Sequence, residues 1–523
     1  MVAPVYVSAS RKAFWLFWSG AAAVTLGVLL HLPMYLMGAP MGYRLAGMEM
    51  DAPMIAGMVA IVLGTAAAGV ALIRPATVSP ADLAALPPDE TAWEPGLAPA
   101  HWGLMLTLTL ALVIDVMKPA TLGFVVPGTL VEYGLTRREV AVLPLAALAG
   151  TTAGSYVWGV LADRMGRRGA ILLAAIMFIG TSICGAMPSF GGNLAMCFLM
   201  GLSAGGMLPI AYTLLAETIP ARQRGWFLVL IGGVGLAGGY LAASGAAALL
   251  EPHFGWRVMW FLGLPTGVVL ILLNQFIPES PSFLMLRGEV EEARAIVRRY
   301  RMTTLSLHAS RPAAAGADVL TSPSFSKVTI ALTICALAWG LVNHGLLLWL
   351  PADLRARGIS AAASDRLLAN AALLALPVSV ATAFMYHRWS TKGTLAAMTG
   401  VMMAGLAGVT LLGWVVPLSG VAPTILIAFL LVGTSGTIAV LLPYCAECYP
   451  AAVRGRATGL VAGSSKLGGI VAQLVTLGAL VPGLGAAAAL LIVPATLGAV
   501  LVARNGPETK GRRLETVDTG LRP

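Results

Sequence analysis

Apolar stretches of roughly 18 or more residues recur along almost the whole chain, and each could cross the hydrocarbon layer of a membrane as a helix. Hydrophobic residues fill 58% of the 523 positions and charged residues 11%, which is more apolar surface than one soluble core can bury. Cys445 and Cys448 form an isolated C-x-x-C without the further ligands of a tetrahedral metal site, so we interpret them as packing residues. The chain is therefore predicted to be an all-α polytopic membrane protein with no metal and no cofactor.

The apolar stretches predict about 14 transmembrane helices. Two come first, at about 13–37 and 53–73, and His31 and Glu49 lie near their predicted membrane edges, where water can satisfy them. Twelve further stretches follow in two sets of six, separated by a long polar segment. The predicted organisation is an N-terminal hairpin and linker (1–101), a six-helix half (102–277), a cytoplasmic central loop (278–327), a second six-helix half (328–505) and a cytoplasmic tail (506–523).

The net charge of +10 arises from short basic clusters between the apolar stretches, a pattern typical of membrane topology rather than of nucleic-acid binding. With the N-terminus in the cytoplasm, most of the 33 Lys and Arg residues lie on that side. Arg11 and Lys12 precede an apolar stretch too long for a signal peptide, so the first helix is predicted to be retained. We predict a bacterial inner (plasma) membrane protein with both termini cytoplasmic.

An internal repeat supports the division into two halves. The pattern E-x-x-P-x-x-x-R-G occurs from Glu217 to Gly225 and returns about 230 residues later from Glu447 to Gly455. The run Pro278-Glu279-Ser280 likewise returns as Pro507-Glu508-Thr509. Two homologous six-helix halves explain these matches, and paired repeats around a midplane cavity are typical of secondary transporters.

A loop after the second helix of the first half, Gly159 to Arg168, places one acid before several bases. Such a loop can pin helix ends together in one conformation and release them in another, or it can simply fix topology. It resembles the signature loop of the major facilitator superfamily, and the repeated E-x-x-P-x-x-x-R-G resembles the branch of sugar porters, organic-ion transporters and aromatic-acid:proton symporters. The resemblance covers about 103–510, and the corresponding second loop, 387–393, lacks the acid. The predicted gating residues are Asp163, Arg164, Gly166, Arg167, Arg168, Glu217, Arg224, Glu447 and Arg454.

Two ionisable residues lie in the first helix of this core. A charge within a span costs at least about 2.5–3.5 kcal/mol on insertion scales, so such residues usually have a function. Asp115 and Lys118 are three residues apart and share a helix face, beside Pro119. They form either a structural ion pair or, as we predict, a proton-coupling site at Asp115 with Lys118 facing the substrate.

Lys466 lies about ten residues into a span, roughly 15 Å deep at 1.5 Å per residue. The resemblance implies that organic-anion and aromatic-acid transporters have a basic residue at this place, where sugar porters have an aromatic one. Snorkelling to the membrane surface is the alternative. Asn343 and His344 replace the paired glutamines of sugar porters, and His344 is either a proton relay or a packed residue. The predicted substrate-binding residues are Lys466, Lys118, His344, Asn343 and Tyr240.

The resemblance implies a secondary transporter, predicted to be proton-coupled and to move a small organic anion such as an aromatic carboxylate by alternating access. An exporter of drugs or metabolites with the same fold is one alternative, and a non-transporting membrane sensor or scaffold is another. No catalytic arrangement is evident in the sequence, so no enzyme activity is predicted. The expected partners are an organic solute, protons and the lipid bilayer, with no nucleic acid; the solute, the direction of flux and the oligomeric state stay open.

Overall fold

The computed structural model describes residues 11–73, 97–302, 323–415, 420–449, 451–480 and 482–510. Within these residues every regular element is helical. Among the described residues, thirteen segments are long and apolar enough to cross a membrane, and one of them, Arg137–Ala186, has 50 residues. Its main helix breaks at Gly166, where φ is 85° and ψ is 167°, so this segment holds two crossings. The prediction of an all-helical membrane protein with about 14 transmembrane helices is confirmed.

The chain forms two compact units. Unit 1 comprises Met1–Pro119, Ala149–Ala221 and His253–Ser310, and unit 2 comprises Ala120–Leu148, Arg222–Pro252 and Arg311–Pro523. Unit 2 therefore contains helical segments from both of the predicted six-helix halves. The division into homologous halves rests on the sequence repeat and stays a prediction.

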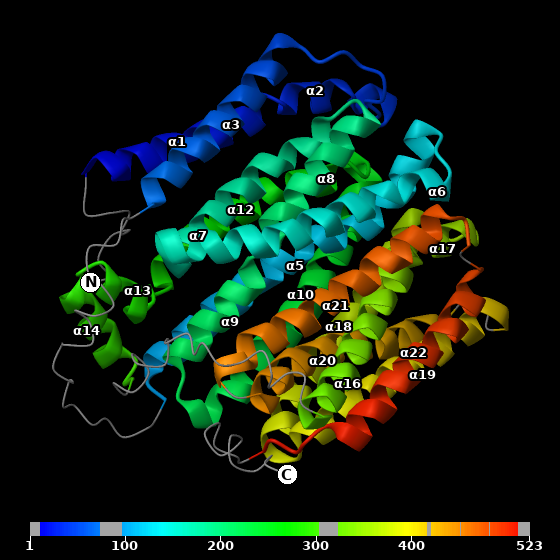
Figure 1. The fold of residues 1–523 in the computed structure, drawn as a ribbon. Coiled ribbons are helices and arrows are strands. Elements are labelled where there is room, and N and C mark those ends of the chain that lie inside the picture. The colour runs from blue at the N-terminus through cyan, green and yellow to red at the C-terminus, as the bar shows by residue number, and fades with distance from the viewer. Residues whose placement is uncertain are drawn as a thin grey trace. The chain divides into compact units, whose positions relative to one another are not determined.

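The N-terminal hairpin of unit 1 consists of α1 (Arg11–Leu29) and α3 (Ala52–Leu72), which lie side by side (Figure 1). They approach so closely that a Cβ added to Gly20 would lie 2.5 Å from the carbonyl oxygen of Gly64. Small residues allow this approach between membrane helices. His31 was expected to be satisfied by water, but it is fully buried and its Nδ1 lies 2.7 Å from the Gly27 carbonyl oxygen.

The hairpin is attached to the rest of unit 1. The Tyr35 hydroxyl in α2 (Leu32–Met37) donates to the Phe254 carbonyl at 2.6 Å. A short 3-10 helix, η1 (Ala39–Met41), follows α2 in the chain. Ile61 of α3 packs close to Gly180 at the end of α7. The further helices between residues 97 and 302 are α5 (Pro99–Tyr133), α6 (Arg137–Val140), α7 (Val142–Gly180), η2 (Thr181–Ala186), α8 (Phe190–Ala204), α9 (Met207–Thr218), α10 (Ala221–Phe254), α11 (Val258–Phe261), α12 (Gly263–Leu273), η3 (Asn274–Phe276), α13 (Pro281–Leu286) and α14 (Val290–Arg299).

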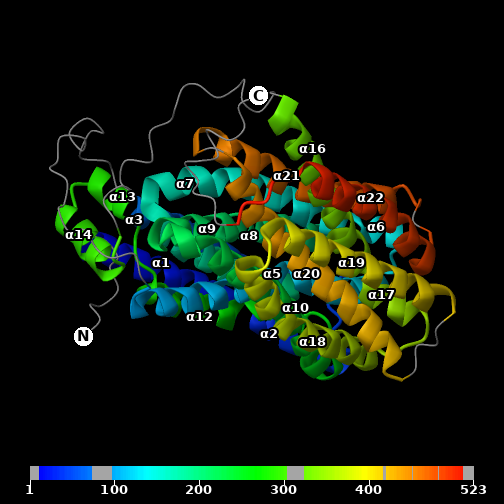
Figure 2. The ribbon, with the colours of Figure 1, turned by 90° about the horizontal axis from the view of Figure 1, so that it is seen from below.

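The C-terminal part of unit 2 is a bundle in which α19 and α20 pack along one another (Figure 2). Serine side chains begin two of its helices: Ser360 accepts a hydrogen bond from the Ala363 amide, and Ser390 accepts one from the Gly393 amide. The elements are α16 (Pro323–Gly340), the π-helix η5 (Leu341–Leu347), α17 (Leu348–Ala356), α18 (Ala361–Arg388), α19 (Thr391–Trp414), α20 (Ala422–Cys448), α21 (Ala451–Leu477) and α22 (Leu484–Asn505).

Candidate functional site

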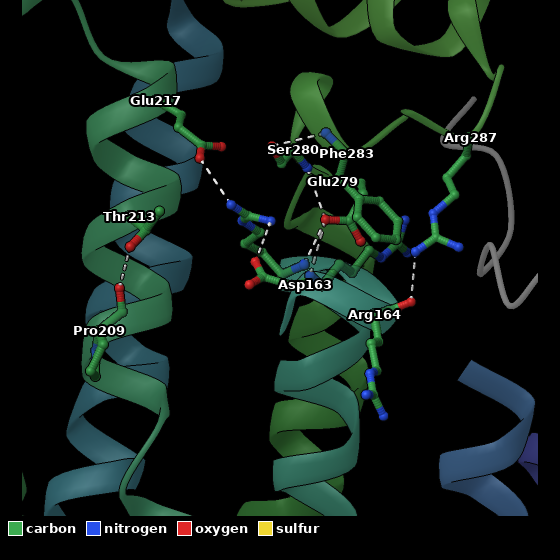
Figure 3. A network of polar contacts seen from close by, with 11 residues as sticks. Asp163, Arg164, Pro209, Thr213, Glu217, Glu279, Ser280, Phe283 and Arg287 are labelled. Atoms are coloured by element: carbon green, nitrogen blue, oxygen red, sulfur yellow. Dashed lines mark hydrogen bonds and ion pairs between the residues drawn. The ribbon is translucent and has the colours of Figure 1, made fainter. Parts of the chain in front are cut away.

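The predicted gating loop of unit 1 surrounds the break in α7 at Gly166. The carboxylate of Glu279 accepts hydrogen bonds from the backbone amides of Arg167, at 2.7 Å, and Arg168, at 3.4 Å (Figure 3). These amides begin the second segment of α7, and the start of a helix attracts a negative charge. Burial raises the pKa of Glu279 above its usual value, although hydrogen bonds from Ser280, Arg167 and Arg168 oppose the shift. Glu279 thus anchors this loop.

Side chains of the same loop form a second set of contacts. The Arg167 guanidinium lies 3.4 Å from Glu217 and 3.8 Å from Asp163 (Figure 3). Asp163 is 78% exposed, so its ion pair contributes little to stability. Arg287 donates to the Arg164 carbonyl at 2.9 Å. The structure therefore brings most of the predicted gating residues of unit 1 together.

Glu279 and Arg287 were not among the predicted gating residues. The repeated Pro-Glu-Ser/Thr run was a signal for Glu279, since it recurs with nearly the same spacing as the E-x-x-P-x-x-x-R-G pattern.

The equivalent loop of unit 2 uses hydroxyl groups around a carboxylate. Glu508 accepts hydrogen bonds from the Thr391 amide at 3.0 Å and the Thr391 hydroxyl at 2.6 Å, and also from the Ser390 hydroxyl. Burial raises the pKa of Glu508, but hydrogen bonds from Ser390, Thr391 and Lys510 outweigh it and hold the pKa below its usual value. The second loop thus lacks the acid of the first but keeps a glutamate bound at the start of a helix, here α19.

Glu447 contacts both the second loop and Gly225, the last residue of the first E-x-x-P-x-x-x-R-G copy. Its carboxylate accepts from the Tyr386 hydroxyl at 2.7 Å and the Thr509 hydroxyl at 2.6 Å. It also lies against Gly225, where an added Cβ would be 2.4 Å from Glu447 Oε1. Arg224, next to Gly225, is in the first turn of α10, whereas the side chain of Arg454 lies outside the described residues.

Gly166→Ala is expected to lower the stability of the protein. The backbone at Gly166 has a positive φ that is almost restricted to glycine, and a Cβ there would lie 2.2 Å from Glu279 Oε2. The backbone strain alone costs about 1–3 kcal/mol. Thermal unfolding of the purified protein measures the loss. The control is Gly159→Ala, at a helical position of the same α7 with nothing within 4 Å of the added Cβ, and this variant should be as stable as the wild type or more so. Equal midpoints for both variants would contradict the expectation.

Asp115 and Lys118 are both buried in α5, with 5% and 2% of their surface exposed. The Lys118 ammonium donates to the Thr181 hydroxyl at 2.5 Å and to the Phe178 carbonyl, and lies 4.8 Å from the centre of the Phe178 ring. These contacts tie α5 to the junction of α7 and η2. The predicted roles of both residues in coupling and substrate binding stay predictions.

Asn343 and His344 lie in the π-helix η5 of unit 2. Short π-helical segments occur often at functional sites because they shift the backbone hydrogen-bond pattern. The His344 ring packs against α21, where a Cβ on Gly469 would lie 2.8 Å from its Cδ2. Lys466, also in α21, is close enough to His344 for their charges to interact. The Trp339 ring meets His344 edge to face at 5.7 Å between centroids.

Gln473 completes this cluster and was not predicted. Its amide donates to the His344 carbonyl and accepts from the Trp349 indole N–H at 3.2 Å. Gln473 is seven residues after Lys466, so both lie on nearly the same face of α21. The seven-residue spacing from Lys466 was the sequence signal that could have identified Gln473. We call Asn343, His344, Lys466 and Gln473 the α21 cluster.

Tyr240 lies in α10, within unit 2. Its ring is 5.9 Å from that of Phe124, and its hydroxyl is buried with no hydrogen-bond partner among the described residues. A buried hydroxyl of this kind is available to a ligand or to water. The structure is consistent with the predicted binding role of Tyr240 but does not test it.

Known proteins resemble most of this chain. A niacin transporter, NiaP, of Acinetobacter baylyi is 28% identical over 438 residues, covering 80% of this chain and 96% of the relative. The 4-hydroxybenzoate transporter PcaK of Pseudomonas aeruginosa is 27% identical over 439 residues, covering 78% and 93%. A benzoate transport protein of Acinetobacter baylyi is 24% identical and covers 73% and 84%.

Solved structures share the fold. The proton:xylose symporter XylE aligns with a TM-score of 0.65 at 20% identity, covering 80% of this chain and 98% of that one. The human organic anion transporter MFSD10 aligns with a TM-score of 0.56 at 16% identity, covering 77% and 100%. The sequence model of the Major Facilitator Superfamily matches residues 108–473, which is well over half of the chain. The chain is therefore a membrane transporter rather than an enzyme, and it belongs to the major facilitator superfamily.

Proposed function

We propose that this protein is a proton-coupled transporter of a small aromatic carboxylate. It acts by alternating access in the plasma membrane, with both termini in the cytoplasm. The observation that carries the proposal is the α21 cluster, in which Lys466 of α21 lies close enough to His344 of η5 for their charges to interact, and η5 packs against α21. A carboxylate forms strong charge-assisted hydrogen bonds with a lysine ammonium, and these are stronger away from bulk water, so Lys466 suits an anionic substrate.

The relatives support this class of substrate. Those named for niacin, 4-hydroxybenzoate and benzoate share most of the length of this chain. Each of these compounds has one carboxyl group on one six-membered aromatic ring. The cluster offers a cation for the carboxylate, amide and imidazole groups for polar ring substituents, and the Trp339 ring nearby. Lys118 and Tyr240 are the further binding residues in our proposal.

Asp115 is the proposed coupling residue. It is a buried acid in a spanning helix, and such residues commonly serve proton transfer in transporters. The loops around Glu279 and Glu508 are the proposed gates, in which Asp163, Arg164, Gly166, Arg167, Arg168, Glu217, Arg224, Glu447 and Arg454 act. The ion pairs of these loops contribute little free energy each, so they can form and break as the protein alternates between conformations.

Uptake into proteoliposomes tests the proposal. Labelled nicotinate and 4-hydroxybenzoate should accumulate under an inward proton gradient, and a protonophore should abolish accumulation. Xylose and an organic cation serve as controls and should neither accumulate nor compete. Accumulation of either control substrate without flux of any aromatic carboxylate would overturn the substrate class, and accumulation that survives the protonophore would overturn proton coupling.

Removal of the N-terminal hairpin, residues 1 to about 98, is expected to leave transport intact but to lower abundance. The hairpin packs on the rest of unit 1 through Tyr35 and Ile61, and lipid can replace most of the apolar contact that it makes. Two crossings are removed together, so the orientation of the remaining helices is kept. Nicotinate uptake should be measured at matched amounts of membrane-inserted protein. Complete loss of uptake under that condition would show that the hairpin belongs to the transport mechanism.

A further inference from the structure

Unit 2 contains a buried triad of charged side chains from three different helices. Arg355, at the end of α17, donates from Nη1 and Nη2 to the two oxygens of Glu251 in α10, at 2.8 and 2.9 Å. The same Nη2 lies 3.0 and 3.1 Å from the two oxygens of Asp365, near the start of α18. The three side chains are between 0% and 15% exposed. We call them the outer triad.

The charges of the outer triad do not balance. One guanidinium neutralises one carboxylate, so the triad has a net charge of −1 when both acids are ionised. Both carboxylates bind the same nitrogen atom, so they are also close to each other. Burial and a neighbouring like charge both favour the neutral form of a carboxyl group, and such a pair tends to share a proton.

The described groups that face the outer triad include no second cation. Asp365 faces Glu251 and Tyr240 from α10 and Arg355 from α17, and its neighbour Arg366 on α18 is exposed. The other charged groups at the end of α17 are engaged elsewhere, as Asp353 pairs with Arg137 at 2.5 Å and Arg357 donates to the Leu412 and Gly413 carbonyls.

One buried polar atom of the outer triad and one of the residue that precedes Asp365 in the chain are available to water. Nε of Arg355 and the hydroxyl of Ser364, next to Asp365, have no hydrogen-bond partner among the described residues. Ser364 is fully buried. Buried polar groups without a protein partner are the usual binding sites of internal water, and water can bring a proton to a buried carboxylate.

The outer triad lies at the far end of α18 from the loop at Glu508. Asp365 is in the first turns of this helix and Arg388 is its last residue, which places them about 35 Å apart at 1.5 Å per residue. If the Glu508 loop faces the cytoplasm, the outer triad faces the external side. The triad also joins α10, from the first sequence repeat, to α17 and α18, from the second.

We propose that Glu251 and Asp365 form a proton-binding site at the external end of unit 2, with Arg355 as their shared counter-ion. The proposal rests on the proton coupling proposed above and adds a second site to Asp115. A proton from external water adds to one carboxylate, and Arg355 then stays paired with the other. Protonation removes one of the two charge pairs of Arg355, either the pair with Glu251 of α10 or the pair with Asp365 of α18, so external pH controls how tightly this end is held.

Infrared difference spectroscopy of the purified full-length protein between about pH 8 and 5 tests the site without transport. The wild type should gain a carbonyl band from a protonated carboxyl group as the pH falls. In Asp365→Asn and in Glu251→Gln one acid faces one arginine, so each variant should lose one carboxyl equivalent of this band. Asp365→Glu keeps both acids and should keep the band.

The matched control is Asp353→Asn, which removes an acid from the balanced pair with Arg137 at the same end of α17. Its band should equal that of the wild type. A band that is unchanged in both Asp365→Asn and Glu251→Gln, or reduced equally in Asp353→Asn, would overturn this proposal even if nicotinate is transported. Failure of proton-driven nicotinate uptake with the band behaving as expected would instead overturn the proposed function.

Discussion

Asp115→Asn should abolish proton-driven accumulation of nicotinate while leaving exchange of nicotinate across the membrane intact. Exchange needs only that the loaded protein changes conformation, whereas accumulation needs net proton release on one side. An asparagine side chain cannot bind and release a proton, but it has nearly the same size as the buried carboxyl group of Asp115, which is 5% exposed. Accumulation and counterflow in the same proteoliposome preparation separate the two activities.

Asp115→Glu is the control for this variant. It keeps a titratable carboxyl group in α5 and should retain part of the accumulation. Accumulation at the wild-type level in Asp115→Asn would show that the Asp115 carboxylate has only a structural role. Proton coupling would then depend on other residues, with His344 and the outer triad as the next ones to test.

Lys466→Ala should lose most of the affinity for aromatic carboxylates. A charge-assisted hydrogen bond contributes about 2–3 kcal/mol, so the dissociation constant for nicotinate should rise roughly 30- to 150-fold. The positive charge next to His344 is also removed, and no other residue of the α21 cluster has a permanent positive charge. Ligand-induced thermal stabilisation of the purified protein reports the affinity directly.

Two further lysine variants make the result specific. Lys466→Arg keeps the charge and should retain some binding. Lys327→Ala removes an exposed charge from the start of α16 and should bind nicotinate as the wild type does. Unchanged affinity in Lys466→Ala, with normal membrane insertion, would remove Lys466 from the binding site and favour the snorkelling alternative.

Local patterns in the sequence were sufficient to predict the helical fold and to find the loop of one proposed gate. A spanning helix satisfies its own backbone hydrogen bonds, so each one is marked by the length and composition of a single continuous segment. The loop from Asp163 to Arg168 could be recognised in the same way, because its glycine and charged residues are adjacent in the chain. Lys466 and Asp115 stood out because a charge within an apolar segment is visible without any knowledge of its neighbours.

Other parts of the candidate site became apparent only in the tertiary structure. Glu279 binds amides 111 and 112 residues earlier in the chain, and Arg355 meets Glu251 at a separation of 104 residues. Arg355 had no predicted role. Its counter-ions lie in two other helices, and helix packing decides which side chains face one another. Hydropathy shows how much of a helix is apolar. Which charged side chains pair between helices depends on the rotation and crossing angle of the neighbouring helices, and these arise from the packing of the whole unit.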